Sequence, residues 1–175
     1  MDRQKLEAEL ERLHRQSFAW ALRCCFEDLD AAAEVLQNTY VKILEGKARF
    51  KGQSAFRTWL FSVIRFTAID HVQRRKKSRW LPLDKNPRLM ELPEPVTAGP
   101  ETEYILPEQV FRKALSRLSP QQNSVLHLVF YQDCSIQEAA DILQMQLGTA
   151  RTHYQRGKQQ LKKWLTNAGF TKDVF

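Results

Sequence analysis

Long apolar runs are absent from this chain of 175 residues. No stretch approaches the roughly 18 uncharged apolar residues that a membrane-spanning helix needs. The N-terminal segment MDRQKLEAELERLHRQ is highly charged and lacks the apolar centre of a signal peptide. A hydrophobic content of 43% is nevertheless that of a globular rather than a disordered chain. We therefore expect a soluble, cytoplasmic protein.

Cysteine is scarce, with only Cys24, Cys25 and Cys134 in the chain. These residues form no CxxC pair and no metal-ligand spacing with the four histidines. The odd count and the adjacent Cys24 and Cys25 argue against a disulfide framework and for reduced intracellular thiols. A redox or zinc role is the alternative, but we expect buried small hydrophobic side chains and no bound metal.

Signatures of catalysis are also lacking. The carboxylates of Asp28, Asp30 and Glu34 form a possible cluster for a hydrolase or nuclease. They have no histidine partner and no phosphate-binding loop in the sequence, so a solvated acidic face is the simpler interpretation. We expect no catalytic residues, no cofactor and no small-molecule substrate.

The charge that is present is unevenly distributed. The net charge is +7, and residues 1–80 hold 16 Lys and Arg against 10 Asp and Glu. Residues 81–109 hold two Lys and Arg against six Asp and Glu, and residues 110–175 hold nine Lys and Arg against four Asp and Glu. Two basic blocks therefore flank an acidic segment, which favours a polyanionic partner such as nucleic acid.

Apolar periodicity near 3.6 residues dominates both basic blocks and predicts an all-α protein. The helices expected in the first block are 2–26, 30–45 and 54–77. Six of the seven prolines fall between Pro82 and Pro107, so 81–109 is expected to be an acidic, Pro-rich linker. The predicted architecture is two small helical domains, 1–80 and 110–175, joined by that linker.

The second domain has clear helix start signals. Ser119 is followed by Pro120 at the first helical position and by Gln122, which together form a capping box. Ser135 and Glu138 repeat the capping box. The helices expected here are Pro120–Tyr131, Ile136–Leu143 and Gly148–Trp164. The last two, joined by a short turn, have the helix-turn-helix pattern.

The last predicted helix has two different faces. One face is an apolar stripe, which we expect to pack in a core. Its members are Ala150, Tyr154, Gly157, Leu161, Trp164 and Leu165. The opposite face carries Thr149, Thr152, Gln155 and Arg156, residue types that read base edges in the major groove. Arg151 and Lys158 flank that face and suit phosphates. A solvated basic surface is the alternative, but no acidic residue occurs from Ile142 through Lys172, which favours DNA.

The helix near the end of the first block combines aromatics with cations. Phe56 and Trp59 lie on its apolar stripe, whereas Phe61 and Phe66 lie off the stripe or at its edge. Arg57, Arg65 and a basic cluster at 74–79 accompany them. Rings that stack and cations that follow phosphates are the chemistry that binds unpaired single strands. For any one of these aromatics, core packing is the alternative.

These motifs together resemble an extracytoplasmic-function (ECF) sigma factor of the sigma-70 family. AAAEVLQNTYVKIL (31–44) is similar to the family's DAEDLVQETFLKAW, and FRTWLFSVIRFTAIDHVQRRKK (56–77) is similar to FRAWLYRIARNLAIDHLRRRRR. ALSRLSPQQNSVLHLVFYQDCSIQEAADIL, followed by GTARTHYQRGKQQL, resembles the family's fourth region. The ordered set covers almost the whole chain. The family often has a glycine in its turn where this chain has Gln144.

The resemblance implies a non-enzymatic factor that binds the beta and beta-prime subunits of core RNA polymerase and promoter DNA, commonly under an anti-sigma factor. Residues 1–80 would be sigma region 2, and 110–175 would be region 4. The residues that would bind core polymerase are Glu34, Gln37 and Tyr40. Those that would recognise and open the −10 element are Phe56, Arg57, Trp59, Phe61, Phe66, Asp70, His71, Arg74, Arg75, Lys76 and Lys77. Those that would read the −35 element are Ser135, Gln137, Thr149, Arg151, Thr152, Gln155, Arg156 and Lys158.

A stand-alone helix-turn-helix repressor or activator is the competing hypothesis. In that case 1–80 would serve for dimerisation or sensing, and the dimer would bind half-sites about one helical turn apart. The aromatic-basic helix within 54–80 distinguishes the two, since such a repressor does not need it.

Overall fold

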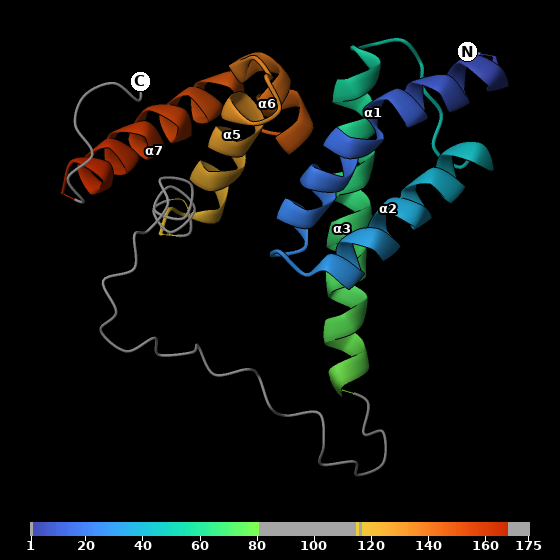
Figure 1. The fold of residues 1–175 in the computed structure, drawn as a ribbon, viewed down its shortest axis with the longest axis horizontal. Helices are drawn as coiled ribbons and strands as arrows, with labels where there is room; N and C mark the ends of the chain where they lie inside the picture. The colour runs from blue at the N-terminus through green and yellow to red at the C-terminus, as the bar shows by residue number, and fades with distance from the viewer. Residues whose placement is uncertain (1, 81–114, 116, 168–175) are drawn as a thin grey trace.

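The computed structural model describes residues 2–80, 115 and 117–167, and within 76–80 the backbone alone. These residues form helices and no strands, which confirms the all-α prediction. The helices are α1 (Arg3–Cys24), α2 (Leu29–Leu44), α3 (Phe56–Trp80), α5 (Pro120–Phe130), α6 (Ile136–Leu143) and α7 (Leu147–Asn167) (Figure 1). The predicted linker, 81–109, lies outside the described residues.

The helix ends follow the local signals in the sequence. Both predicted capping boxes form, at Ser119 with Gln122 and at Ser135 with Glu138. Each box satisfies backbone donors that the first turn of a helix would otherwise leave unpaired. Gln144 ends α6 in the left-handed conformation, with φ 54° and ψ 47°, at the position where the family often has glycine.

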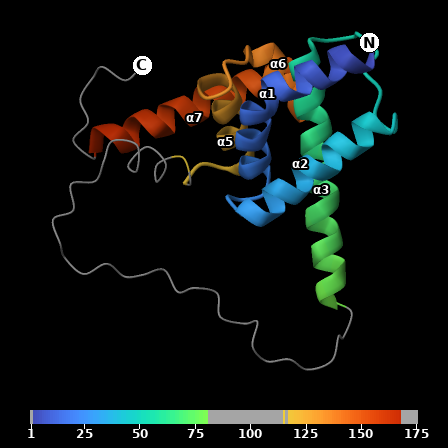
Figure 2. The ribbon, with the colours of Figure 1, turned by 45° about the vertical axis from the view of Figure 1, so that its right-hand side comes forward.

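Helices α1, α2 and α3 pack against one another and form the N-terminal bundle. Its core is built from apolar positions on all three helices, including Leu13 and Trp20 of α1, Leu36 of α2, and Leu60 and Ile64 of α3. Figure 2 shows α1 and α2 crossing one side of the long α3 helix. The loop from Glu45 to Ala55 connects α2 to α3.

Helices α5, α6 and α7 form the C-terminal bundle, in which each helix contacts the other two. A separate cluster of Leu118, Leu126, Leu161 and Leu165 holds α5 against α7. The two helices approach closely at Gly157, where an added Cβ would lie 2.9 Å from Leu126 Cδ1.

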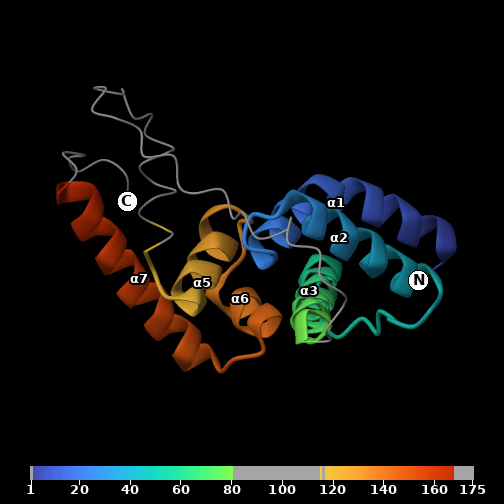
Figure 3. The ribbon, with the colours of Figure 1, turned by 90° about the horizontal axis from the view of Figure 1, so that it is seen from below.

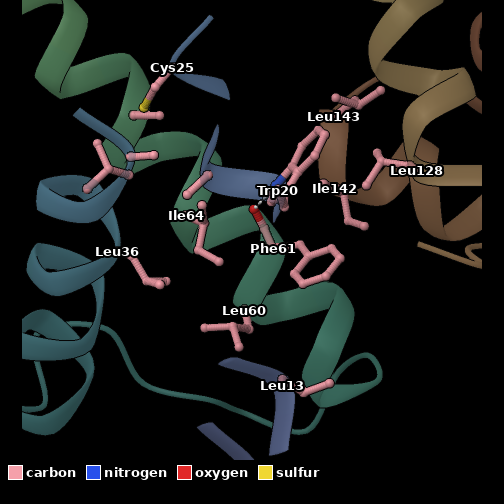
Figure 4. Close-up of a cluster of buried hydrophobic side chains, with 14 of the residues drawn as sticks. Leu13, Trp20, Cys25, Leu36, Leu60, Phe61, Ile64, Leu128, Ile142 and Leu143 are labelled. Atoms are coloured by element: carbon pink, nitrogen blue, oxygen red, sulfur yellow. Dashed lines mark hydrogen bonds between the residues drawn. The ribbon is translucent and has the colours of Figure 1, made fainter. Parts of the chain in front are cut away.

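The two bundles are in direct contact, because α6 packs against α3 (Figure 3). Their apolar residues form one continuous buried cluster, which runs from Trp20 and Phe61 to Leu128, Ile142 and Leu143 (Figure 4). The indole N–H of Trp20 donates a 3.0 Å hydrogen bond to the carbonyl of Phe61 at the centre of this contact. The sequence predicts two domains but says nothing of this shared core.

Candidate nucleic-acid interface

Helix α7 buries one face and exposes the other, as its sequence pattern predicts. Ala150, Gly157, Leu161 and Leu165 are buried in the C-terminal bundle. The predicted base-reading side chains, together with Arg151 on the flank, are all exposed: Thr149, Arg151, Thr152, Gln155 and Arg156. The exposed arc holds donors and acceptors and no carboxylate, so it suits a polyanionic duplex.

Trp164 departs from the predicted stripe. The structure leaves this side chain 43% exposed and places the Arg117 guanidinium 3.8 Å from its ring centroid. This cation–π contact covers the ring at the edge of the stripe in place of core packing. The prediction that Trp164 belongs to the buried face is therefore wrong.

Two of the predicted −35 residues lie on the first helix of the helix-turn-helix. The Ser135 hydroxyl accepts the Glu138 N–H at 3.1 Å and donates to the Glu138 carboxylate at 2.9 Å, so it is engaged as a helix cap. The hydrogen bond from the Ser135 backbone N–H is the main cause that lowers the pKa of Glu138. Gln137 is exposed and donates to Asp141 at 3.0 Å. In this fold class the first helix crosses the DNA backbone, where such groups can contact phosphates.

An aromatic cluster stands where α3 begins. The Phe50 ring lies 5.3 Å from that of Phe56 and 5.4 Å from that of Trp59, and Phe56 and Trp59 are 5.3 Å apart. All three side chains are only partly buried, so their rings have both a packed and an open side. Sequence reasoning named Phe56 and Trp59 and missed Phe50. Its aromatic character in the cationic segment Lys47–Lys51 was the signal that could have identified it.

Two further predicted −10 residues lie on the outward side of α3. Phe66 is 49% exposed, which is unusual for a large ring, and Arg74 is exposed two turns further along. Asp70 lies between them and pairs with Lys42 of α2 at 3.7 Å. An exposed ring and an exposed cation on one helix supply the stacking surface and the phosphate contact that an unpaired strand needs.

Phe61, which the sequence assigned to the −10 surface, is buried in the structure. Its side chain is fully buried, and its ring lies 6.2 Å from that of Trp20 in a stacked arrangement. The position lies off the stripe that faces α2, but α1 and α6 cover it from their side. In this conformation no base can reach the ring, and Phe61 is a core residue.

Three of the remaining predicted −10 residues contact other parts of the protein. His71 Nδ1 lies 3.5 Å from the Glu34 carboxylate, and Arg75 pairs with Asp28 at 2.9 Å. Arg57 is directed at the C-terminal bundle and donates to the carbonyls of Gln132 and Asp133. The side chains of Lys76 and Lys77 lie outside the described part of the chain.

The predicted polymerase-binding residues divide between two sides of α2. Glu34 and Gln37 are exposed. Tyr40 instead turns toward α1, where its hydroxyl lies 3.2 Å from His14 Nδ1, and burial raises its pKa. Tyr40 is therefore held partly buried against α1, whereas the other two are exposed. The exposed face continues through Asn38 and Val41, which sequence reasoning did not select.

An open groove of about 710 Å³ separates this face of α2 from α3. The groove brings together residues with different predicted partners. Glu34 is predicted to bind core polymerase, and the predicted DNA-binding residues are Asp70, His71, Arg74 and Arg75. Asp28 also lines the groove. Its carboxylate caps α2 by accepting the Ala31 N–H at 3.0 Å, and this bond is the main cause that lowers its pKa. Asp28 and Glu34 of the acidic cluster are thus engaged in structural contacts.

The prediction of buried cysteines holds for two of the three, since Cys24 is half-buried. All three are free, and Cys25 and Cys134 are buried. Burial raises the pKa of Cys24 to about 12 and that of Cys25 and Cys134 to about 11, so the thiolate is scarce at neutral pH. None of the described helices is long and apolar enough to cross a membrane.

This fold and its exposed surfaces define a DNA-binding protein with a helix-turn-helix and a second, aromatic-basic helix. Comparison with known families matches residues 10–78 to "Sigma-70 region 2" and residues 108–161 to "Sigma-70, region 4". RNA polymerase sigma factor YlaC of Bacillus subtilis is 32% identical over 165 residues, which cover 91% of this chain and 93% of the relative. The ECF RNA polymerase sigma factor SigX of the same organism is 27% identical over 146 residues, covering 78% and 72%.

The chain therefore belongs to the sigma-70 family of RNA polymerase sigma factors, in its ECF class. Members of this family are non-catalytic transcription initiation factors that act with core RNA polymerase at promoters.

Two solved structures share the fold. The sigma factor RpoE of Bartonella quintana, in complex with the anti-sigma factor NepR, has a TM-score of 0.68 at 23% identity and covers 93% of this chain and 97% of its own. CnrH in complex with the cytosolic domain of CnrY has a TM-score of 0.60 at 18% identity, covering 94% and 90%.

Proposed function

We propose that residues 1–80 act as region 2, which binds core polymerase and the −10 element, and that 110–175 act as region 4, which reads the −35 element. The observation that carries this proposal is the exposed, carboxylate-free arc of α7 in a chain that also presents the aromatic-basic start of α3. One surface suits duplex DNA and the other suits an unpaired strand.

Base reading at the −35 element is assigned to the arc of Thr152, Gln155 and Arg156. Arg156 is exposed, and arginine binds guanine O6 and N7 with two hydrogen bonds. Arg156→Ala is expected to weaken binding to the preferred duplex by about 1–3 kcal/mol and to relax selectivity at one base pair. Fluorescence anisotropy with a set of single-base duplex variants measures both effects.

Arg12→Ala provides the matched control for that experiment, because Arg12 is an exposed cation paired with Glu9 at the other end of the molecule. It removes the same charge and leaves α7 intact. An equal loss of affinity for every duplex with Arg156→Ala would instead make Arg156 a phosphate contact.

Strand capture at the −10 element is assigned to Phe50, Phe56 and Trp59 together with Phe66. Phe50, Phe56 and Trp59 form one partly open aromatic cluster where α3 begins. Phe66 exposes its ring further along α3. Core polymerase would bind the exposed face of α2 that includes Glu34 and Gln37. Asn38 and Val41 extend the same face and are added to the assignment.

An anti-sigma factor is the expected regulator, because the sigma factor RpoE, which shares this fold, was solved in complex with one. The protein would then work in the cytoplasm, where its polymerase is. The first test is gel filtration of the full chain with core RNA polymerase, followed by transcription from a pool of promoter fragments. Co-elution and transcripts from one class of promoter support the proposal. Tight duplex binding without any association with core polymerase would favour the stand-alone repressor.

A further inference from the structure

Thr152 lies in the middle of the exposed arc of α7, and its hydroxyl is already engaged within the helix. Thr152 Oγ1 donates a hydrogen bond to the Gly148 carbonyl, one turn earlier, at 2.9 Å. The amide of Gln155 and the guanidinium of Arg156 have no hydrogen bond or ion pair to any residue that the structure describes. Thr152 therefore differs from these two neighbours on the arc, because its only proton donor is used by its own helix.

The engaged hydroxyl leaves the methyl group as the part of the Thr152 side chain that a base can contact. The hydroxyl is turned toward the helix backbone, whereas the side chain as a whole remains exposed. A β-branched side chain has few allowed χ1 states, and the hydrogen bond to the preceding turn selects among them. Thr152 thus presents a fixed apolar group on an otherwise polar arc.

Thymine carries the matching group in the major groove. Its C5 methyl lies on the groove edge of every A·T pair, whereas the edges of adenine, guanine and cytosine present only donors and acceptors. Apolar contact between a threonine methyl and this group is an established form of base recognition. Such a contact needs no hydrogen bond, so it is compatible with the engaged hydroxyl of Thr152.

The spacing between Thr152 and Arg156 predicts where this contact falls in the DNA sequence. The two residues are one turn apart on the same face of α7, which is about 6 Å along the helix axis. Successive base pairs of B-DNA are about 3.4 Å apart. A recognition helix that lies in the major groove would therefore bring Thr152 within about two base pairs of the guanine assigned to Arg156.

We propose that Thr152 contacts the C5 methyl of a thymine within about two base pairs of the guanine bound by Arg156, and that −35 recognition is therefore sensitive to pyrimidine methylation. The inference rests on the proposed function of α7. At this position uracil, which lacks the methyl group, binds more weakly than thymine. For the same reason 5-methylcytosine binds more tightly than cytosine.

A uracil scan tests the inference. The probe is a short fluorescein-labelled duplex that the full chain enriches from a random-sequence pool, with each thymine of either strand replaced in turn by deoxyuridine. Fluorescence anisotropy is expected to show about fourfold weaker binding at one thymine, the factor that corresponds to burying one CH₂ group. With cytosine at that position, a C5 methyl should strengthen binding by about fourfold. Equal affinity for thymine and uracil at every position would overturn the inference.

Two substitutions separate the methyl group of Thr152 from its hydroxyl. Thr152→Ser keeps the hydroxyl and removes the methyl, so this variant should bind the thymine and uracil duplexes equally. Thr152→Val keeps a methyl in the same β-branched shape and removes the hydroxyl, so it should retain the preference of about fourfold for thymine. Discrimination kept by serine and lost by valine would show that the hydroxyl contacts the base, and it would overturn the inference.

Thr166→Ser is the matched control. Thr166 makes the same local contact, since its Oγ1 donates to the Lys162 carbonyl at 2.9 Å, and it is exposed on the same helix. It lies about 21 Å further along α7, beyond the proposed base-reading arc. This variant should keep the wild-type preference for thymine over uracil. Loss of the preference in the control would mean a general change in α7 and would count against a specific contact by Thr152.

The same experiments distinguish a failure of this inference from a failure of the proposed function. If the full chain enriches no sequence, and Arg156→Ala binds every duplex as wild type does, α7 does not read DNA and the proposed −35 role is wrong. If a sequence is enriched and Arg156→Ala relaxes selectivity at one base pair, a uracil scan without effect shows that only the assignment of Thr152 is wrong.

Discussion

Phe61 and Phe66 lie on the same helix and differ completely in their surroundings. Phe61 is 0% exposed and packs on Trp20, whereas Phe66 is 49% exposed on the outward side of α3. The two residues therefore separate a structural role from the proposed strand-binding role within one helix.

Phe61→Ala is expected to lower the free energy of unfolding by about 3–5 kcal/mol, since it leaves a cavity in the shared core. Phe66→Ala should change it by less than about 0.5 kcal/mol and should instead reduce promoter opening. Urea unfolding monitored by circular dichroism measures stability, and permanganate reactivity of unpaired thymines measures opening. Loss of stability with Phe66→Ala would show that its ring packs against the protein.

At Gln144, the backbone conformation predicts how a substitution changes the stability. A side chain with a Cβ in the left-handed region costs about 1 kcal/mol, and glycine avoids this cost. Gln144→Gly should therefore raise the stability by about 0.5 kcal/mol, despite losing the hydrogen bond from Gln144 Nε2 to the Asp141 carbonyl. Thermal unfolding measures the change.

The matched control is Gln160→Gly, on an exposed position inside α7. There the backbone is helical, so the same substitution should destabilise by about 1 kcal/mol. If both substitutions destabilise, the turn conformation of Gln144 is not the source of strain.

At the scale of elements, α5 and α7 pack closely because Gly157 has no side chain. A Cβ at that position would lie 2.9 Å from Leu126 Cδ1 and 3.3 Å from Gln122 Cβ, and both partners are buried. Helix α7, the proposed recognition helix, is thus positioned by a glycine on its buried side.

Gly157→Val is expected to destabilise the C-terminal bundle by about 1–3 kcal/mol and to shift α7, which weakens duplex binding as well. Gly148→Val serves as the control, since a Cβ there meets nothing within 4 Å. Urea unfolding and duplex anisotropy measure the two effects. An unchanged stability of Gly157→Val would mean that Leu126 can move aside freely.

At the scale of the whole molecule, the contact between bundles makes stability depend on pH. Burial, together with the smaller effect of the nearby Arg23 charge, lowers the pKa of His127 to about 4. The ordinary histidine value is about 6.5. Below pH 6.5 the unfolded chain therefore binds a proton that the folded chain excludes, and stability falls as the pH drops toward 4.

The expected loss between pH 7 and pH 5 is about 2 kcal/mol from this residue. His127→Asn should remove that part of the pH dependence, although it lowers stability at pH 7. Urea unfolding of both proteins at several pH values gives the difference, in which the carboxylates that titrate in both chains cancel. Identical slopes for the two proteins would show that His127 is protonated as readily in the folded chain.

The sequence by itself determined the helices, their caps and the two faces of α7. These features depend on neighbours along the chain: Ser119 meets Gln122 one turn later, and Ala150, Gly157 and Leu161 share a face whatever surrounds them. The order of motifs was also sufficient for the family resemblance. For this reason the exposed arc of α7, to which −35 recognition is assigned as a proposal, could be predicted as one surface.

Only the tertiary structure decided which surfaces are covered. The period of α3 places Phe61 off the stripe that faces α2 but does not reveal that α1 and α6 bury it from another side. Tyr40 turns to His14, and Arg57 pairs with carbonyls more than 70 residues away in sequence. Phe50 joins Phe56 and Trp59 only because the loop folds back. The physical reason is that periodicity defines the faces of a helix, whereas long-range packing selects the neighbour of each face.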